Sequence, residues 1–192
     1  VKVGGVDVRQ IDPHVLMAQI AFVFQNSRLF KASILENVRA ARPNATREQV
    51  LSALKAAQCE DILEKLPQGI DTLIGSEGTY LSGGEQQRIA LARAILKDAP
   101  IVVLDEATAF ADPENEALIQ KAFTELTRGR TVIMIAHRLS TVKSADRIYV
   151  LQDGHAAESG THKELLRKKG IYANLYGKEV EENEKQSPCT GI

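Results

Sequence analysis

The sequence predicts an α/β fold built around a mostly parallel β-sheet, and two observations support this. Short apolar runs alternate along the chain with longer stretches of helical periodicity, which is the pattern of strands joined by crossover helices. Two of the runs, Ile101–Leu104 and Thr131–Ile135, are almost continuously apolar, as is typical of strands that are covered on both faces. The 192 residues are enough for one compact domain of this kind.

Each expected element follows from a local signal. The expected strands are Ile20–Phe24, Ile101–Leu104, Thr131–Ile135 and Arg147–Leu151. The expected helices are Ser33–Ala40, Thr46–Ala57, Ser82–Lys97, Pro113–Arg128, Thr161–Lys168 and Ile171–Tyr176. Thr46 supplies a capping residue and Glu48 a negative charge at a helix N-terminus. Pro113 suits the first turn of its helix, and Gly129 ends that helix.

The order of these elements suggests how the chain is organised. Residues 31–99 carry almost no strand signal, so we expect a helical subdomain inserted between core residues 1–30 and 100–177. Residues 178–192 are polar and charged, with only Val180 and Ile192 as sizeable apolar side chains. We expect this last stretch to be a disordered tail.

Charge and composition exclude several classes of protein. Lys plus Arg (24) nearly cancel Asp plus Glu (25), so no overall field favours nucleic acid, and we expect no nucleic-acid partner. No apolar run approaches the ~18 residues of a membrane span, and no secretory signal opens the chain. Cys59 and Cys189 form no metal-ligand pattern. A reduced, cytosolic setting follows.

Three of the expected strands run directly into polar side chains. Gln25 follows the first strand, Asp105 and Glu106 follow the second, and His137 follows the third. Parallel strands bring their carboxyl ends to one edge of a sheet, where ligands of open α/β folds bind. A carboxylate pair, an amide and an imidazole gathered there can hold a metal ion, orient a water molecule and accept its proton.

Each of these residues also has a purely structural interpretation. Gln25 alone is an ordinary loop amide bonded to backbone, and His137 alone is a loop histidine with its hydrogen bonds satisfied. Asp105 and Glu106 directly follow buried aliphatic residues, where two carboxylates need a cation nearby. Mg²⁺ bound to a phosphate is such a cation.

The segment Leu81–Arg88 precedes a long helix and has two interpretations. Ser82 and Glu85 have the S-x-x-E spacing of a capping box, so the segment can simply start the helix. Gly83 and Gly84, however, each cost a helix about 1 kcal/mol relative to alanine. They also leave backbone N–H groups open at a helix N-terminus, where an anion is favoured. The segment can serve both purposes.

Taken in order, these segments resemble the motifs of ATP-binding cassette (ABC) proteins. The matches are Gln25 to the Q-loop, Leu81–Arg88 to the signature, Ile101–Glu106 to the Walker B strand with its catalytic glutamate, Ala111-Asp112 to the D-loop, and His137 to the switch histidine. The resemblance extends to about Tyr176. It implies a RecA-like P-loop NTPase core with an inserted α-helical subdomain.

Two further segments resemble the exporter type of this family. Ser33–Val38 is similar to the segment just after the Q-loop, and Ile74–Gly78 is similar to an acidic loop that touches the membrane domain. Glu85 stands where glutamine is common in the signature. No G-x-x-x-x-G-K-[ST] phosphate loop (Walker A) occurs in the 192 residues. By resemblance we expect an N-terminally truncated domain, whose missing strand would lie between the strands that end in Asp105 and His137.

The resemblance also implies a mechanism, in which two such domains sandwich ATP and Mg²⁺. Ser82, Gly83, Gly84 and Glu85 would bind the nucleotide held by a second nucleotide-binding domain. Asp105 and Gln25 would help hold Mg²⁺, directly or through water. Gln25 would also be a nucleotide-binding residue and would link the nucleotide site to the membrane domain. Glu106 would be the general base, His137 would touch the γ-phosphate, and Asp112 would act across the dimer interface.

The function implied is that of an ATPase driving an exporter-type transporter. Its partners would be the second nucleotide-binding domain and a transmembrane domain, at the cytoplasmic face of the cell membrane. Two alternatives remain at this point. One is a cassette ATPase not involved in transport, which acts on ribosomes or DNA, and the other is a truncated, non-catalytic remnant.

Overall fold

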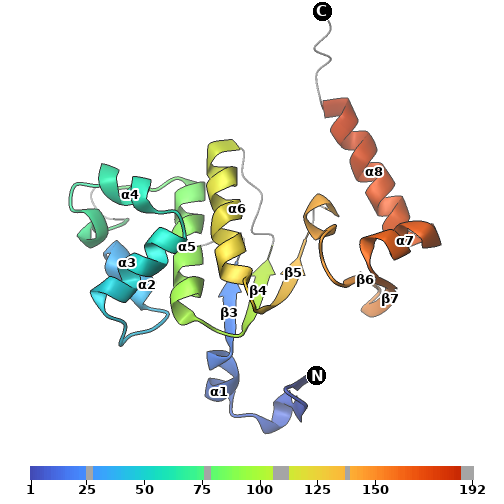
Figure 1. Ribbon diagram of the computed structural model, residues 1–192, viewed down its shortest axis with the longest axis horizontal. Helices are drawn as coiled ribbons and strands as arrows, with labels where there is room; N and C mark the ends of the chain where they lie inside the picture. The colour runs from blue at the N-terminus through green and yellow to red at the C-terminus, as the bar shows by residue number, and fades with distance from the viewer. Residues whose placement is uncertain (25–27, 76–78, 106–112, 137–138, 187–192) are drawn as a thin grey trace, which may run out of the picture. The chain divides into compact units, whose positions relative to one another are not determined.

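The structure is a computed structural model, and it describes residues 1–24, 28–75, 79–105, 113–136 and 139–186. The chain divides into two compact units, Val1–Ile135 and Ala136–Ile192 (Figure 1). Of the segments expected from the sequence, 1–30, 31–99, 100–177 and 178–192, only 100–177 crosses the boundary between the two units. The division of the chain into a core, a helical subdomain and a tail remains a prediction.

The first unit is built on a parallel sheet, as the sequence predicts. Its strands are β3 (Ile20–Val23), β4 (Ile101–Asp105) and β5 (Thr131–Ile135), in the order β3-β4-β5. Both neighbouring pairs are parallel. The expectation of a missing strand between β4 and β5 is wrong. The two strands pair directly from Ile101↔Thr131 to Asp105↔Ile135, and hydrogen-bonded neighbours lie only about 4.7–4.9 Å apart.

The apolar core lies between this sheet and two long helices, α5 (Gly83–Lys97) and α6 (Pro113–Thr127), and it continues among the shorter helices of residues 34–74. Alternate side chains of β4, Val102 and Leu104, are fully buried in it. The expectation that β4 and β5 are covered on both faces is wrong. Every residue of β5 is exposed, since β5 is the outer strand among the described residues. The other residues of β4 are only partly buried.

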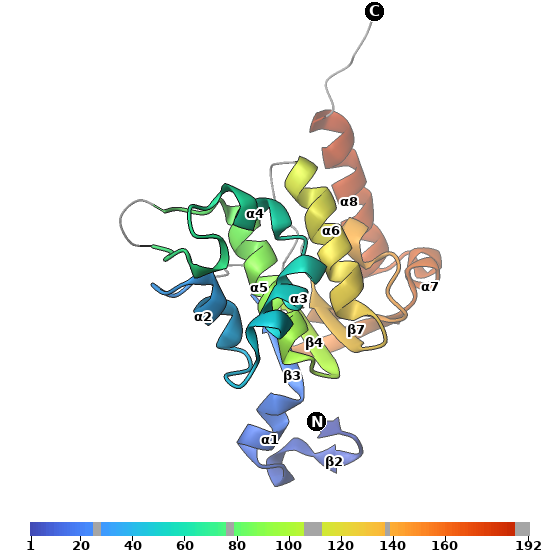
Figure 2. The same ribbon diagram turned by 60° about the vertical axis from the view of Figure 1, so that its left-hand side comes forward.

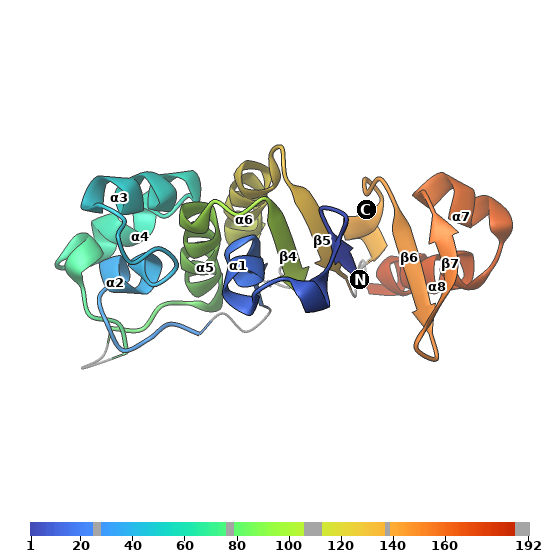
Figure 3. The ribbon, with the colours of Figure 1, turned by 90° about the horizontal axis from the view of Figure 1, so that it is seen from below.

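Helix α5 is the centre of the helical part of this unit (Figure 3). It packs against α6 and β3 on one side, and against α2 (Ile34–Arg39) and α3 (Arg47–Ala56) on the other. Capping boxes start α2, α3 and α5. The sequence predicts the box of α5, and for α3 it predicts only the N-cap Thr46. In each of the three boxes, the N-cap hydroxyl accepts from the N3 backbone N–H, and the N3 side chain accepts from the N-cap N–H. The short helix α4 (Glu60–Lys65) was not expected, because its N-cap Cys59 makes no side-chain cap.

The start of the chain also holds elements that were not predicted from the sequence. Strands β1 (Lys2–Val3) and β2 (Val6–Asp7) form a small antiparallel hairpin whose turn residues, Gly4 and Gly5, both have positive φ. Helix α1 (Pro13–Ala18) follows and leads into β3 (Figure 2). Asp12 caps it and Pro13 opens it, two start signals that the short apolar pattern obscured. Short 3-10 helices are η1 (Val8–Gln10), η2 (Gly69–Asp71) and, in the second unit, η3 (Leu139–Val142).

The second unit contains an antiparallel hairpin and two helices. The hairpin is β6 (Ile148–Gln152) with β7 (His155–Gly160), and the helices are α7 (His162–Lys168) and α8 (Ile171–Gln186). Their small core is centred on Leu165 and Tyr172. Strand β7 was not predicted, because its residues are small and polar rather than β-branched.

The disordered tail expected from Lys178 is wrong as far as Gln186, because α8 continues to that residue. Residues 178–186 are mostly Glu, Lys and Gln, which have high helix propensity. A low apolar content was therefore not sufficient to predict disorder. Residues 187–192 lie outside the described residues.

Candidate nucleotide site

The sheet places one predicted site residue at the expected edge. Asp105 is the last residue of β4, partly buried, and lies in register with Ile135 at the end of β5. Val23, the last residue of β3, pairs with Leu104. The carboxyl ends of all three strands therefore meet at one edge, as predicted. Gln25, Glu106, Asp112 and His137 lie outside the described residues.

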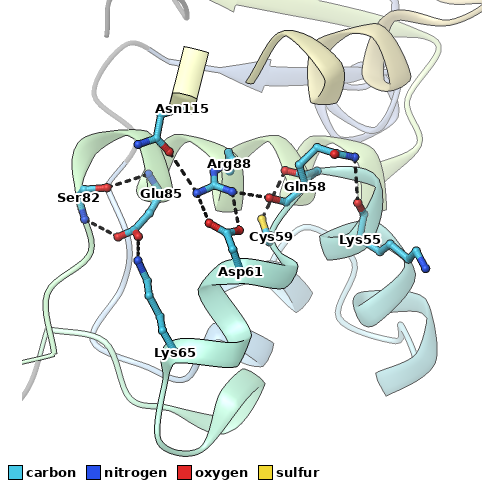
Figure 4. A network of polar contacts seen from close by, with 10 residues as sticks. Lys55, Gln58, Cys59, Asp61, Lys65, Ser82, Glu85, Arg88 and Asn115 are labelled. Atoms are coloured by element: carbon cyan, nitrogen blue, oxygen red, sulfur yellow. Dashed lines mark hydrogen bonds and ion pairs between the residues drawn. The ribbon is translucent and has the colours of Figure 1, made fainter. Parts of the chain in front are cut away.

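The N-terminus of α5 shows that the capping-box interpretation of the signature segment is correct. The Ser82 hydroxyl accepts from the backbone N–H of Glu85 at 3.3 Å, and the Glu85 carboxylate accepts from the backbone N–H of Ser82 at 2.8 Å (Figure 4). These reciprocal bonds fix the entry of the chain into the helix. They leave the amides of Gly83 and Gly84, at the first two helical positions, without an acceptor among the described residues.

Exposure divides the four predicted nucleotide-binding residues of this segment into two pairs. Ser82 and Gly83 are exposed, whereas Gly84 and Glu85 are buried. The Glu85 carboxylate contacts Lys65 at the end of α4 in addition to Ser82 (Figure 4). Glu85 therefore has structural partners within its own chain. A ligand approaching from outside would meet Ser82, Gly83 and the open backbone amides.

Gly84 is required by the packing of α5 against α6. A Cβ at this position would lie 2.9 Å from Cγ and 3.0 Å from Cβ of Asn115. Real Cβ atoms essentially never approach another atom more closely than 3.0 Å, so Asn115 would have to shift, and a change of its side-chain rotamer would not move its Cβ. The glycine thus lets the helix that starts at the signature lie directly against α6.

Arg88 joins this arrangement to α4, although no role was predicted for it. Its side chain is almost fully buried, and its guanidinium donates to both Asp61 carboxylate oxygens, at 2.6 and 2.9 Å. It also donates to the carbonyl of Gln58 at 2.5 Å and to Oδ1 of Asn115 at 3.1 Å (Figure 4). One side chain of α5 therefore holds α4 and α6 in place through directed bonds.

Arg88 also perturbs the carboxyl group that it binds. Burial opposes the ionisation of Asp61, but the hydrogen bonds and charge of Arg88 outweigh it, so the pKa of Asp61 lies below its usual value. Cys59, next to this network, is buried, and burial raises the pKa of its thiol to about 12. A thiol with this pKa is an inert core residue and not a nucleophile.

The described residues fit a magnesium site only in part. Asp105 supplies a carboxylate oxygen, which is the ligand type that Mg²⁺ prefers, at a sheet edge where phosphates bind. Within the described ranges no three His, Cys, Asp or Glu side chains are grouped so as to hold a metal ion. A site with one protein carboxylate is consistent with Mg²⁺, which usually keeps several waters and takes its other ligands from the substrate phosphates.

Arg88, Asp61, Lys65 and Asn115 were not predicted from the sequence. Arg88 interrupts the apolar face of its helix, since the residues around it, Ile89, Leu91 and Ala92, are all fully buried. A charged side chain on the buried face of a helix is almost always paired with another polar or charged group. The sequence could not identify that partner, which lies in another helix.

No helix among the described residues combines the length and apolar character that crossing a bilayer requires.

Comparison with known proteins agrees with this geometry. The sequence profile of the family described as "ABC transporter" matches residues 1–109. The chain is 47% identical over 176 residues to the ATP-dependent lipid A-core flippase of Legionella pneumophila (strain Paris), covering 92% of this chain and 30% of that protein. It is 48% identical over 176 residues to the mycobactin import ATP-binding/permease protein IrtA of Mycolicibacterium thermoresistibile, covering 92% of this chain and 19% of that protein.

A solved structure supports the same assignment. A bacterial Atm1-family ABC exporter with ATP bound matches with a TM-score of 0.83 and 38% sequence identity, covering 97% of this chain and 32% of that chain. This chain thus spans less than a third of the length of each of these relatives. It belongs to the ABC transporter family, and its sequence and fold are those of an exporter-type nucleotide-binding domain.

Proposed function

We propose that this chain supplies the ATP-hydrolysing machinery of an exporter-type transporter and acts as one of a pair of nucleotide-binding domains. The observation that carries the proposal is the N-terminus of α5. Ser82 and Gly83 are exposed there, and the first two amides of the helix are open. A helix of this length favours an anion at that end through its dipole and its free N–H groups.

In this proposal the α5 N-terminus caps a nucleotide bound by the second domain. The Ser82 hydroxyl and the amides of Gly83 and Gly84 donate to the γ-phosphate of that nucleotide. Glu85 holds the segment in its bound shape through its bond to the Ser82 amide. Its negative charge is offset by Lys65, which it contacts, so the site keeps its preference for an anion.

The sheet edge is the proposed site of the reaction on the chain's own nucleotide. Asp105 and Gln25 hold Mg²⁺, which when bound neutralises charge on the phosphate oxygens. Glu106 accepts the proton of the attacking water, as a general base does. His137 donates to the γ-phosphate, and Asp112 acts across the interface between the domains. The contribution of the protein is positioning and charge stabilisation.

We further propose a transmembrane domain as the partner that the ATPase drives, at the cytoplasmic face of the cell membrane. Two neighbouring segments of the first unit, 28–33 and 72–75, form the docking surface. Their backbones are joined by bonds from Ile74 to the Ala32 carbonyl at 3.0 Å and from Ile34 to the Thr72 carbonyl at 3.3 Å. They expose Phe30 and Leu73 by 61% and 55%, and such apolar side chains suit a protein interface.

The experiment that tests this function uses a grafted transporter, in which this chain replaces the matching 176 residues of the Legionella flippase. Ser82→Arg places a long cation where the γ-phosphate would bind. We expect it to abolish ATP hydrolysis while the purified protein stays folded. Loss of the capping bond alone would lower stability by about 1 kcal/mol and leave turnover per folded molecule unchanged. That second outcome would contradict the proposal.

A further inference from the structure

The segment 28–33 is fixed in place by one buried side chain, Asn37 of α2. Its Oδ1 accepts from the backbone N–H of Phe30 at 2.7 Å. Its Nδ2 donates to the carbonyls of Phe30, Ala32 and Ser33, at 3.0, 3.2 and 2.9 Å. Four bonds from one fully buried amide determine the backbone path of a loop that has no regular secondary structure of its own.

Arg93 connects this loop to α5, the helix that begins at the signature segment. Its guanidinium donates to the Asn37 carbonyl at 2.8 Å, to Asn37 Oδ1 at 2.5 Å and to the Arg28 carbonyl at 3.0 Å. It also lies over the ring of Phe30, 5.1 Å from the ring centre. Arg93 and Asn37 thus hold both ends and the exposed aromatic residue of the loop.

The bonds of Arg93 depend on the geometry of its guanidinium group, because all of its acceptors are neutral oxygen atoms. Among the described residues its guanidinium forms no ion pair with a carboxylate, and its bonds go to carbonyl oxygens and an amide. Burial lowers its pKa from the usual value, which reflects the cost of placing the charge there. Only the planar fork of arginine reaches all these oxygens at once, and lysine cannot replace it.

We propose that Arg93 and Asn37 form a latch that makes segment 28–33 move together with α5. Arg93 is a positioning residue, since it contacts neither the nucleotide nor the reacting atoms. Ten residues of helix, about 15 Å, separate it from Gly83. A shift of the α5 N-terminus, as it closes on a nucleotide, is thereby transmitted to the segment that faces the membrane partner. The bonds between Arg93, Asn37 and the segment 28–33 are features of the structure. Their role in transport rests on the proposed function.

The latch is tested by hydrogen exchange on the 192-residue chain. We expect Arg93→Lys to speed exchange of the amides in 28–34 and 72–75 by at least about tenfold, with less change in α3. Phe30→Ala, at an exposed residue, keeps the core intact and removes only the ring contact. It should speed the same amides by about two- to fivefold. The matched control is Lys97→Met. Lys97 also lies on α5 and donates to backbone carbonyls, those of Met17 and Ile20 at 2.8 and 2.6 Å, but on another segment.

The outcomes separate the latch from ordinary packing. If Arg93→Lys accelerates exchange equally in 28–34, α3 and α5, or leaves 28–34 unchanged, there is no latch. Lys97→Met should leave 28–34 unchanged, and a tenfold acceleration there would equally overturn the proposal. In the grafted transporter Arg93→Lys should lower kcat severalfold with KM for MgATP unchanged, and an unchanged kcat would overturn the coupling role. A failure of the proposed function would show separately, as full turnover by Ser82→Arg.

Discussion

Arg88 is a charged side chain in the buried part of the first unit, and its burial is offset by Asp61, Gln58 and Asn115. An arginine without such partners would be strongly destabilising, because an uncompensated charge would remain in the core. The same residue links the helix of the signature segment to α4 and α6. At the scale of single residues, the shape of the candidate site therefore depends on side chains that do not touch a nucleotide.

The lowered pKa of Asp61 makes stability depend on pH. The pKa of Asp61 in the folded state lies below the unfolded value of about 3.9. The ionised Asp61 therefore contributes its full stabilisation of the fold at pH values above that unfolded value. It is lost as the pH falls through the folded pKa. We expect the free energy of unfolding to fall more steeply below about pH 4 in the wild-type chain than in Asp61→Asn. Urea unfolding at several pH values measures the free energy of unfolding of both proteins. Equal dependence on pH in the two would show that the pKa of Asp61 does not change on folding.

Helix α5 shows what sequence can predict at the scale of elements. The N-caps Ser82 and Thr46 and the end of α6 before Gly129, which has φ +69°, were predicted because these signals are local. Helix α4 was missed because its N-cap Cys59 makes no side-chain cap, and α1 because its apolar pattern is short. The partners of Arg88 and Arg93 were missed because they lie far away in the sequence. Local chemistry predicts where an element begins, and tertiary packing decides what it touches.

The contact between α5 and α6 gives a prediction about Gly84. Alanine normally stabilises a helix interior by about 1 kcal/mol relative to glycine. Here its Cβ would collide with Asn115, and overpacking costs about 1–3 kcal/mol. We expect Gly84→Ala to be neutral or destabilising, and less so when Asn115→Ala is also present. Thermal unfolding of the four proteins of this mutant cycle measures the coupling.

Gly177 in α8 is the matched control for that experiment. A Cβ at this position meets nothing within 4 Å, so Gly177→Ala should stabilise the chain by up to about 1 kcal/mol. A similar gain for Gly84→Ala would show that the close approach of α5 to α6 is not rigid.

At the scale of the molecule, the parallel sheet and the helix that begins at the signature segment were predicted correctly, but the place of the missing strand was not. The carboxyl-end rule predicts at which edge of the sheet a ligand binds. It does not predict which strands are neighbours. The pairing of β4 with β5 is a property of the assembled sheet. The exposure of every residue of β5 could not be predicted either, since its apolar run is identical in character to that of β4.

The 192-residue chain by itself gives a further prediction: it should not bind ATP tightly. Its residues reach a nucleotide from the γ-phosphate and metal side, and it has no G-x-x-x-x-G-K-[ST] loop to cradle the phosphates. Fixing a charged, flexible ligand costs several kcal/mol or more. Isothermal titration with Mg-ATP should therefore show no binding at micromolar concentrations. Micromolar affinity, together with a cooperative thermal transition, would contradict this expectation.

The central claim is that Ser82 acts on a nucleotide bound by the second domain, whereas Glu106 acts on the chain's own. The most direct measurement compares two mixed dimers of the grafted transporter, purified through a different tag on each copy. In the first, one copy carries Ser82→Ala and the other Glu106→Gln, which leaves one complete site if the signature acts across the interface. In the second, both changes lie in one copy, which then leaves none. We predict ATP hydrolysis by the first dimer, near half the wild-type rate if the sites act independently, and a rate lower by about 10²-fold or more in the second. Hydrolysis by the second dimer and not by the first would contradict the account.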